Sequence, residues 1–256
     1  QVTIERGVDP REFVLHAFGG TCPLMCALFG EELGVKRIVI PNVAAVNGAF
    51  GLVSADIVHE YTHATTMGAP EAAEEANGIF ARMGARAEEQ LRKDGFSPDR
   101  MRLERSIDLR YVRQVHEVTT PLRNGGAIDD AAIDQLIGEF EALYQRKFGK
   151  GSTYRGAGVE MTLFRLTARG LITPPKLERA RLGKPESAAA KTSTREIFVA
   201  ARDGLACADI YDFAKLLPGN VVVGPGVIHS PITTMVVQQD QIGRMDEYRN
   251  LVIEFE

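Results

Sequence analysis

Residues 14–23 read Val-Leu-His-Ala-Phe-Gly-Gly-Thr-Cys-Pro, a mostly apolar run that breaks at two glycines before a proline. The apolar run favours a strand, and proline favours the first turn of a helix. Gly19 and Gly20 let the backbone approach a ligand closely because neither carries a Cβ. Free N–H groups at the start of the next helix attract anions. The stretch predicts a strand, a glycine loop and a helix, with a candidate nucleotide site at the loop.

The residues that follow extend this unit. The sequence predicts a helix over residues 23–33 that ends at Gly34, and a strand over residues 37–40 that stops at Pro41. A pair of glycines is by itself an ordinary turn, so the ligand hypothesis depends on this context. Strand, loop, helix and strand within about forty residues form a crossover unit of α/β folds, which bind ligands beyond the carboxyl ends of strands.

Several motifs along the chain share their order with a known family. They are the runs at residues 18–23, 31–37, 48–56, 103–111, 140–149, 217–220, 224–228, 233–234 and 250–252. Among them, Phe18-Gly19-Gly20-x-x-Pro23 is the glycine loop, and Arg110-Tyr111 begins a counterpart of an Arg-Tyr-x-Gly-Gln motif. In this order the motifs resemble the A-type subunit of the hydantoinase, 5-oxoprolinase and acetone carboxylase family, over essentially the whole chain.

The resemblance implies an α/β fold: the C-terminal part of an actin-like (ribonuclease H-like) ATPase domain, followed by a mixed, β-rich C-terminal domain. It also implies that the chain is the C-terminal portion of a longer subunit that uses ATP and magnesium. The first phosphate loop and most acidic magnesium-site residues would then lie upstream. Gly19, Gly20 and Thr21 would contact the adenosine side of ATP, with Asn47 and Gly48 as secondary candidates. A seam of small packing residues is the alternative reading of Asn47 and Gly48.

The same resemblance implies the reaction and the partners. The parent enzyme would phosphorylate a carbonyl or enolate oxygen of a small cyclic amide or ketone, for ring opening (hydrolase) or carboxylation. It would act in the cytoplasm as an oligomer with a hydantoinase B-type partner subunit. No catalytic residue is assigned in this chain.

The composition argues against a nucleic-acid-binding protein and against a membrane-spanning segment. The 256 residues are 45% hydrophobic, which is enough for a sizeable core, and the net charge of −4 without a basic patch argues against nucleic acid. The uncharged stretch 38–55 is interrupted by Pro41, Asn47 and Gly51, so it indicates buried core and no membrane span. Three cysteines without C-x2-C spacing indicate reduced thiols.

Periodicity divides the chain near residue 100. Residues 1–100 are expected to hold the ATPase part with a helical extension, and residues 101–256 the β-rich domain. The predicted helices cover residues 44–64, 70–91 (closed by Gly95) and 129–148; the predicted strands cover 107–112, 159–166, 196–199, 221–223, 233–237 and 251–253, with a loop at 173–190.

His59-Glu60-x-x-His63 matches the zinc hydrolase pattern H-E-x-x-H, in which two histidines one helical turn apart hold zinc. The only candidate third ligands are Glu71, Glu74 and Glu75 on the next predicted helix. The family resemblance already accounts for His59 and its neighbours. We therefore expect no bound metal, and keep a zinc hydrolase as the less favoured alternative.

Some residues depart from the family pattern. Cys22 stands in place of a third loop glycine, Arg113 replaces the glycine of the Arg-Tyr motif, and residues 238–241 replace a Pro-Gly turn. These changes leave a second alternative open: a noncatalytic scaffold in which the region from residue 101 docks a partner. His229 reads as a polar residue at a strand end, and Glu117 as a functional or interface carboxylate without an assigned role.

Overall fold

The computed structural model describes residues 8–69, 72–123, 125–199 and 203–255. It divides into two compact units. Unit 1 combines Gln1–Ser54 with Pro174–Glu256, and unit 2 is Ala55–Thr173. The chain thus leaves unit 1, completes unit 2 and returns to unit 1.

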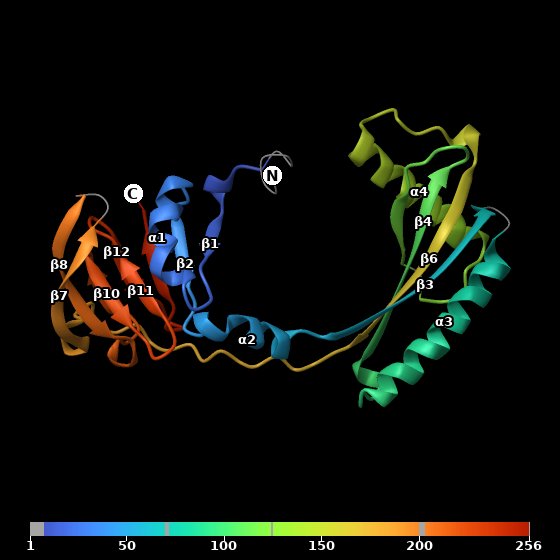
Figure 1. Ribbon diagram of the computed structural model, residues 1–256. Helices are drawn as coiled ribbons and strands as arrows, with labels where there is room; N and C mark the ends of the chain where they lie inside the picture. The colour runs from blue at the N-terminus through green and yellow to red at the C-terminus, as the bar shows by residue number, and fades with distance from the viewer. Residues whose placement is uncertain (1–7, 70–71, 124, 200–202, 256) are drawn as a thin grey trace. The chain divides into compact units, whose positions relative to one another are not determined.

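Unit 1 contains a five-stranded sheet with the order β1-β2-β13-β12-β9 (Figure 1). Its strands are β1 (Val14–His16), β2 (Arg37–Ile40), β9 (Val221–Val223), β12 (Ile242–Met245) and β13 (Leu251–Glu254). β1 and β2 run parallel and are joined by helix α1 (Cys22–Glu32), whereas the other neighbours are antiparallel. The predicted α/β crossover unit is therefore confirmed, and strands from the end of the chain complete its sheet.

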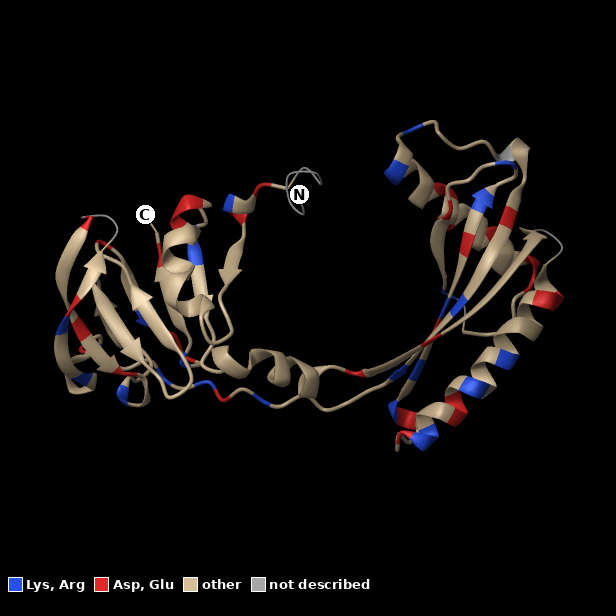
Figure 2. Ribbon diagram, viewed as in Figure 1, with Lys and Arg blue, Asp and Glu red and all other residues tan. Residues whose placement is uncertain are grey.

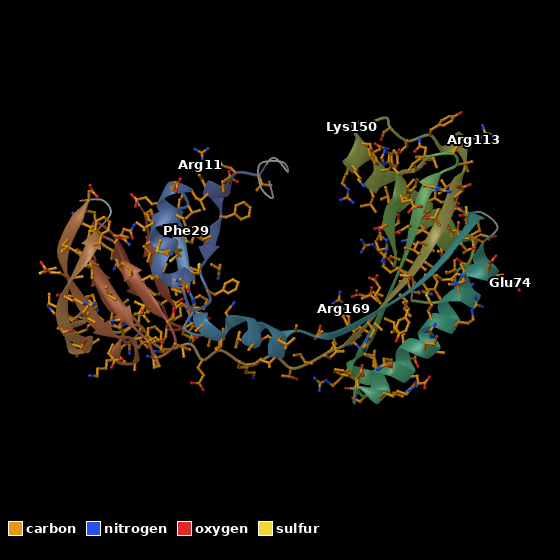
Figure 3. All side chains as sticks on the ribbon, in the orientation of Figure 1. Arg11, Phe29, Glu74, Arg113, Lys150 and Arg169 are labelled. Atoms are coloured by element: carbon orange, nitrogen blue, oxygen red, sulfur yellow. The ribbon has the colours of Figure 1, made fainter. Side chains whose placement is uncertain are left out.

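A second sheet of unit 1 has the order β11-β10-β8-β7. Its strands are β7 (Lys191–Val199), β8 (Gly204–Asp212), β10 (Gly226–His229) and β11 (Thr234–Val237). α1 lies against β2 of the first sheet and β11 of the second. Ile38, Ile253 and Met235 share one buried cluster, and Phe29 of α1 (Figure 3) packs against it. The two sheets and α1 thus form one core.

Unit 2 is an antiparallel sheet with the order β3-β6-β4-β5, covered by two helices (Figure 1). Its elements are β3 (Ile57–Gly68), α3 (Ala73–Lys93), β4 (Met101–Tyr111), β5 (Val118–Leu122), α4 (Asp130–Phe148) and β6 (Val159–Gly170). Phe164, Leu166 and Ala168 alternate inward along β6 and share one buried cluster with both helices. Arg165 and Arg169 alternate to the other face, so both helices cover the same side of the sheet.

The long predicted helices of unit 2 are confirmed. α3 buries six residues at helical spacing (Ala76, Ile79, Phe80, Met83, Ala87 and Leu91) and carries Glu74 in its first turn (Figure 3) and Lys93 in its last. Charged residues recur along the whole helix (Figure 2). Asp129 caps α4 by accepting a hydrogen bond from the Ala132 amide at 2.8 Å. These helices were predictable because their signals are local.

Two expectations about organisation are corrected. The helix predicted for residues 44–64 is instead a short 3-10 turn, η3 (Ala44–Val46), then α2 (Asn47–Ser54) and then β3. β-branched residues from Ile57 favour extended backbone, and β6 provides the pairing partner. The boundary expected near residue 100 does not follow the compact units, because β3 pairs with β6 and β13 pairs with β2. Among the described residues, no helix is both long and apolar enough to cross a membrane.

Candidate functional site: the glycine loop of unit 1

Gly19 makes the sharp exit from β1. Its φ of +93° is a left-handed conformation that strains any residue with a Cβ. Its amide donates a 2.7 Å hydrogen bond to the carbonyl oxygen of Ala44 in η3. The sequence therefore needs glycine at this position, and the bond ties the loop to the segment that leads into α2.

Gly20, unlike Gly19, is not required to be glycine by its own backbone or neighbours. A Cβ built there would approach only the Ile232 carbonyl oxygen, at 4.0 Å, and its φ lies outside the left-handed range. The Gly20 carbonyl accepts a 3.0 Å hydrogen bond from Thr233 Oγ1. Thr233 itself belongs to a tight turn, since its carbonyl accepts a bond from the Ser230 amide at 2.9 Å. Hydrogen bonds to Ala44 and Thr233 therefore hold the loop in place. The positions that a Cβ of Gly19 or Gly20 would occupy have no other atom closer than 4.0 Å.

The start of α1 suits an anion. Thr21 precedes the helix without capping it through its side chain, and the first turn holds no acidic residue. Both features leave the positive end of the helix uncompensated by the protein. Cys22 lies within α1, so replacing the third family glycine imposes no left-handed strain. Burial raises the pKa of the Cys26 thiol to about 12, which keeps it a neutral core residue.

Asn47 and Gly48 begin α2, directly after η3. A Cβ at Gly48 would meet nothing within 4 Å, so the position is open. The Gly19–Ala44 hydrogen bond places the start of this segment beside the glycine loop. The structure thus brings the first three candidates together and links them to the other two through Ala44. A role for any of them in ATP binding stays a prediction.

Thr233 is a site residue that the sequence analysis did not single out. It was noted only within a family motif, yet it is 8% exposed and holds the Gly20 carbonyl. The two residues are 213 positions apart, so periodicity could not connect them. From the sequence, residues 233–237 were expected only to form a strand.

The zinc alternative loses its geometric basis. His59 and His63 lie on β3, where four residues span about 13 Å, whereas one zinc ion needs both nitrogens within about 2 Å. His59 Nε2 instead pairs with Asp94 Oδ2 at 2.6 Å. Of the third-ligand candidates, Glu71 lies outside the described residues. Across the part of the chain that the structure describes, no three His, Cys, Asp or Glu residues are grouped to hold a metal.

Two further residues singled out from the sequence have ordinary surroundings. His229 ends β10, exposed, with Nδ1 3.4 Å from Thr234 Oγ1. Glu117 lies 3.7 Å from Arg110, which also binds Glu160 at 3.0 Å. Both residues remain without an assigned role.

The sequence of the chain matches those of known proteins along almost its whole length. The hydantoinase/oxoprolinase domain matches residues 1–61, and the hydantoinase/oxoprolinase C-terminal domain matches residues 63–254. An uncharacterised protein of Methanocaldococcus jannaschii is 31% identical over 99% of the chain and 35% of its own length. The acetone carboxylase beta subunit of Xanthobacter autotrophicus is 28% identical over 91% of the chain and 34% of its own length.

Solved structures agree on the fold. The nucleotide-free structure of acetone carboxylase, from work on ATP-dependent acetone carboxylation, matches with a TM-score of 0.90 at 24% identity. The ATP-dependent caprolactamase from Pseudomonas jessenii matches with a TM-score of 0.71 at 26% identity. Each match covers 99% of this chain and 37% of the other, so the chain spans about a third of these relatives. These neighbours confirm the predicted fold class, a mixed α/β fold. The chain belongs to the hydantoinase/oxoprolinase family.

Proposed function

We propose that the chain is the C-terminal part of a larger ATP-dependent subunit and supplies the adenosine side of its nucleotide site. The observation that carries this is the loop at Gly19 and Gly20: open backbone, braced by Ala44 and Thr233, that leads into an uncapped helix start. Backbone of this kind can lie flat against a nucleotide, and a helix start favours negative charge.

The residues present fit part of ATP. Gly20 and Gly48 leave space that a side chain would fill, and Thr21 offers a hydroxyl that makes no cap bond. In this proposal the loop backbone and the start of α2 position the nucleoside. The magnesium ligands and the first phosphate loop belong to the upstream part of the subunit.

Bound ATP would supply a phosphoryl group that turns a poor leaving oxygen on a carbonyl into a good one. The substrate class we propose is a small cyclic amide or ketone, in keeping with relatives named as a caprolactamase and an acetone carboxylase. Those relatives are named as subunits, which supports an oligomer with a partner subunit. The partner that we propose is a hydantoinase B-type subunit. The contribution of this chain would be to hold the nucleotide.

The experiment is a Gly20→Val substitution in the full-length subunit. Valine is compatible with the backbone at Gly20, so the new side chain acts mainly by occupying the ligand space. We expect the Michaelis constant for ATP to rise at least tenfold, about 1.4 kcal/mol of lost binding. Gly138→Val, at an exposed helical glycine of unit 2 with open space around it, is the matched control and leaves the constant unchanged.

A folded Gly20→Val subunit with wild-type ATP kinetics would show that the loop is structural only. It would favour the alternative of a noncatalytic scaffold. Circular dichroism and the thermal midpoint of both variants establish folding before the kinetics are compared.

A further inference from the structure

β3 lies at an edge of the unit 2 sheet (Figure 1). Among the residues that the structure describes, it pairs only with β6, over Ile57–Gly68. Native sheets protect such an edge by keeping it short or by placing lysine, proline or a bulge on it. β5, the opposite edge of the same sheet, follows this rule, because it has five residues and contains Pro121. β3 has twelve residues and therefore presents a much longer edge.

The first part of β3 carries none of these protective features. Residues 57–64 read Ile-Val-His-Glu-Tyr-Thr-His-Ala, without lysine, arginine or proline, and the bulge in the pairing with β6 comes only after Ala64. Glu60 is the one acidic residue of this segment. β-branched and aromatic side chains favour strand pairing. Residues 58–64 therefore offer a regular edge to another strand.

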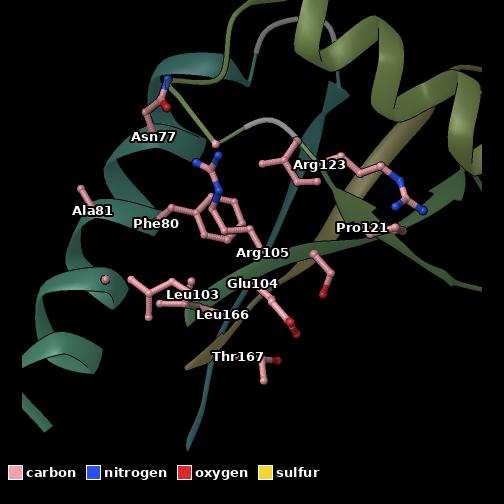
Figure 4. A pocket seen from close by; sticks show the side chains of 14 residues that line it. Asn77, Phe80, Ala81, Leu103, Glu104, Arg105, Pro121, Arg123, Leu166 and Thr167 are labelled. Carbon is pink, nitrogen blue, oxygen red and sulfur yellow. The ribbon is translucent and has the colours of Figure 1, made fainter. Parts of the chain in front are cut away.

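The helix side of the sheet also stays open at β3. There, Phe80 of α3 and Leu166 of β6 belong to one buried cluster (Figure 4). Tyr61 lies directly opposite Leu166 in the ladder, yet it is only partly buried, and His63, opposite the buried Phe164, is exposed. None of the twelve residues of β3, all of which the structure describes, is buried. A further strand beside β3 would extend this core.

A second copy of the same strand fits this edge. Two β3 strands can pair antiparallel about a two-fold axis at Tyr61, the middle of residues 58–64, and a contact of this kind closes with two copies. In this register Tyr61 lies opposite Tyr61 of the second copy, which gives a favourable cross-strand aromatic pair. Glu60 lies opposite Thr62 of the second copy, so no two carboxylates face each other.

The charges on the open face of the sheet suit the same register. Arg165 of β6 lies opposite Thr62 in the ladder and binds Glu60 of its own chain at 2.6 Å. In the paired sheet, Glu60 of the second copy would follow Thr62 in the row that begins at Arg165. These two strand spacings amount to about 10 Å, which extended arginine and glutamate side chains can bridge together. Each Glu60, whose side chain is 51% exposed in the single chain, would then lie between two guanidinium groups.

We propose that β3 is a dimerisation edge, which pairs antiparallel with β3 of a second copy of this chain about Tyr61. The contact joins two four-stranded sheets into one continuous sheet. It assigns a role to the segment that carries the H-E-x-x-H pattern, and it does not depend on the nucleotide function proposed for the glycine loop.

The test measures the mass of the 256-residue chain in solution by analytical ultracentrifugation over a series of concentrations. We expect a reversible dimer with a dissociation constant of about 10 μM. Thr62→Glu should weaken the dimer at least tenfold, because the new carboxylate faces Glu60 of the second copy. Within one chain the change is compatible with the fold, since residue 62 is exposed and lies opposite Arg165.

A second variant tests the register. Glu60→Thr/Thr62→Glu exchanges the two side chains, so a carboxylate again faces a threonine, and dimerisation should return to within threefold of the wild type. An axis at Thr62 would oppose two carboxylates in both variants and give no such recovery. Ser193→Glu adds the same charge at an exposed position of β7 and is the matched control, which should leave the dimer unchanged.

Circular dichroism establishes that each variant is folded before the masses are compared. A wild-type chain that stays monomeric up to about 200 μM would overturn the proposal. So would a dimer that Thr62→Glu leaves intact, or a loss in Thr62→Glu that the exchanged variant does not restore.

Discussion

The two units bury their apolar residues to different extents. Unit 2 gathers both helices and its sheet into one cluster, with Tyr111, Phe140 and Phe164 fully buried. The N-terminal part of unit 1 instead exposes large apolar side chains to between 40% and 78%: Phe13, Val14, Phe18, Leu24, Met25, Val46, Leu52 and Val53. Each unit has a buried core of its own. The exposed apolar side chains in the N-terminal part of unit 1 are the ones close in sequence to the glycine loop and to the start of α2.

The position of β1 strengthens this contrast. Among the residues that the structure describes, β1 lies at the edge of its sheet and pairs, in parallel, only with β2. Parallel strands are normally covered on both faces, and the edge strands of a sheet are normally kept short, charged or covered by other chain. The glycine loop lies at the end of this strand, and exposed Phe18, Leu24 and Met25 are its neighbours in sequence. This is the arrangement expected if the site is shared with an upstream part of the subunit.

The largest expected effect is in the core of unit 2. Phe140→Ala removes a fully buried ring, whose centroid lies 5.1 Å from that of the Tyr111 ring and 5.5 Å from that of the Tyr144 ring. We expect it to destabilise unit 2 by about 3–5 kcal/mol. Hydrogen exchange of the α4 amides measures this loss within that unit.

Leu52→Ala is the control from unit 1, since Leu52 is 78% exposed. It should change stability by less than about 0.5 kcal/mol. A Phe140→Ala loss as small as that of Leu52→Ala would remove the contrast between the units.

A smaller effect is expected where unit 1 braces the glycine loop. Thr233→Val removes the hydroxyl that donates to the Gly20 carbonyl and keeps the side-chain shape. Unit 1 should lose about 1 kcal/mol. Exchange of the Gly20 and Thr21 amides should also quicken. Thr194→Val, at an exposed hydroxyl of β7, is the control and should leave those amides unchanged. Unaltered exchange in Thr233→Val would mean that the turn does not order the loop.

The smallest effect concerns the pairing of β3 with the end of α3. Hydrogen bonds from His59 first and Gln90 second lower the pKa of the Asp94 carboxyl below its usual 3.8. A lowered folded pKa stabilises the protein at pH values above the unfolded pKa, and this contribution disappears as pH falls through the folded value. Asp94→Asn should therefore lower the denaturation midpoint slightly at neutral pH and leave it unchanged well below pH 3.8. A difference that persists in acid would assign the effect to packing.

The parts that could be predicted from sequence depend on local signals. Turn residues, capping residues or a 3.6-residue period in the local sequence predict the glycine loop, α3 and α4. The β3 segment was predicted as helix because the small and apolar residues that precede it are compatible with either helix or strand. Its extended conformation is fixed by pairing with β6, which lies about a hundred residues later in the sequence. The Thr233–Gly20 bond and the position of β3 at a sheet edge likewise arise only after distant segments meet.

The most direct test compares the dissociation constant of ATP for this 256-residue chain with that for the full-length subunit, by calorimetry under the same conditions. If the loop supplies half of a shared site, the chain binds ATP with a constant above roughly 100 μM, at least tenfold weaker than the full subunit. Gly20→Val in the full subunit should then remove most of that difference. Equal affinities, with low-micromolar binding by the isolated chain, would contradict the shared site.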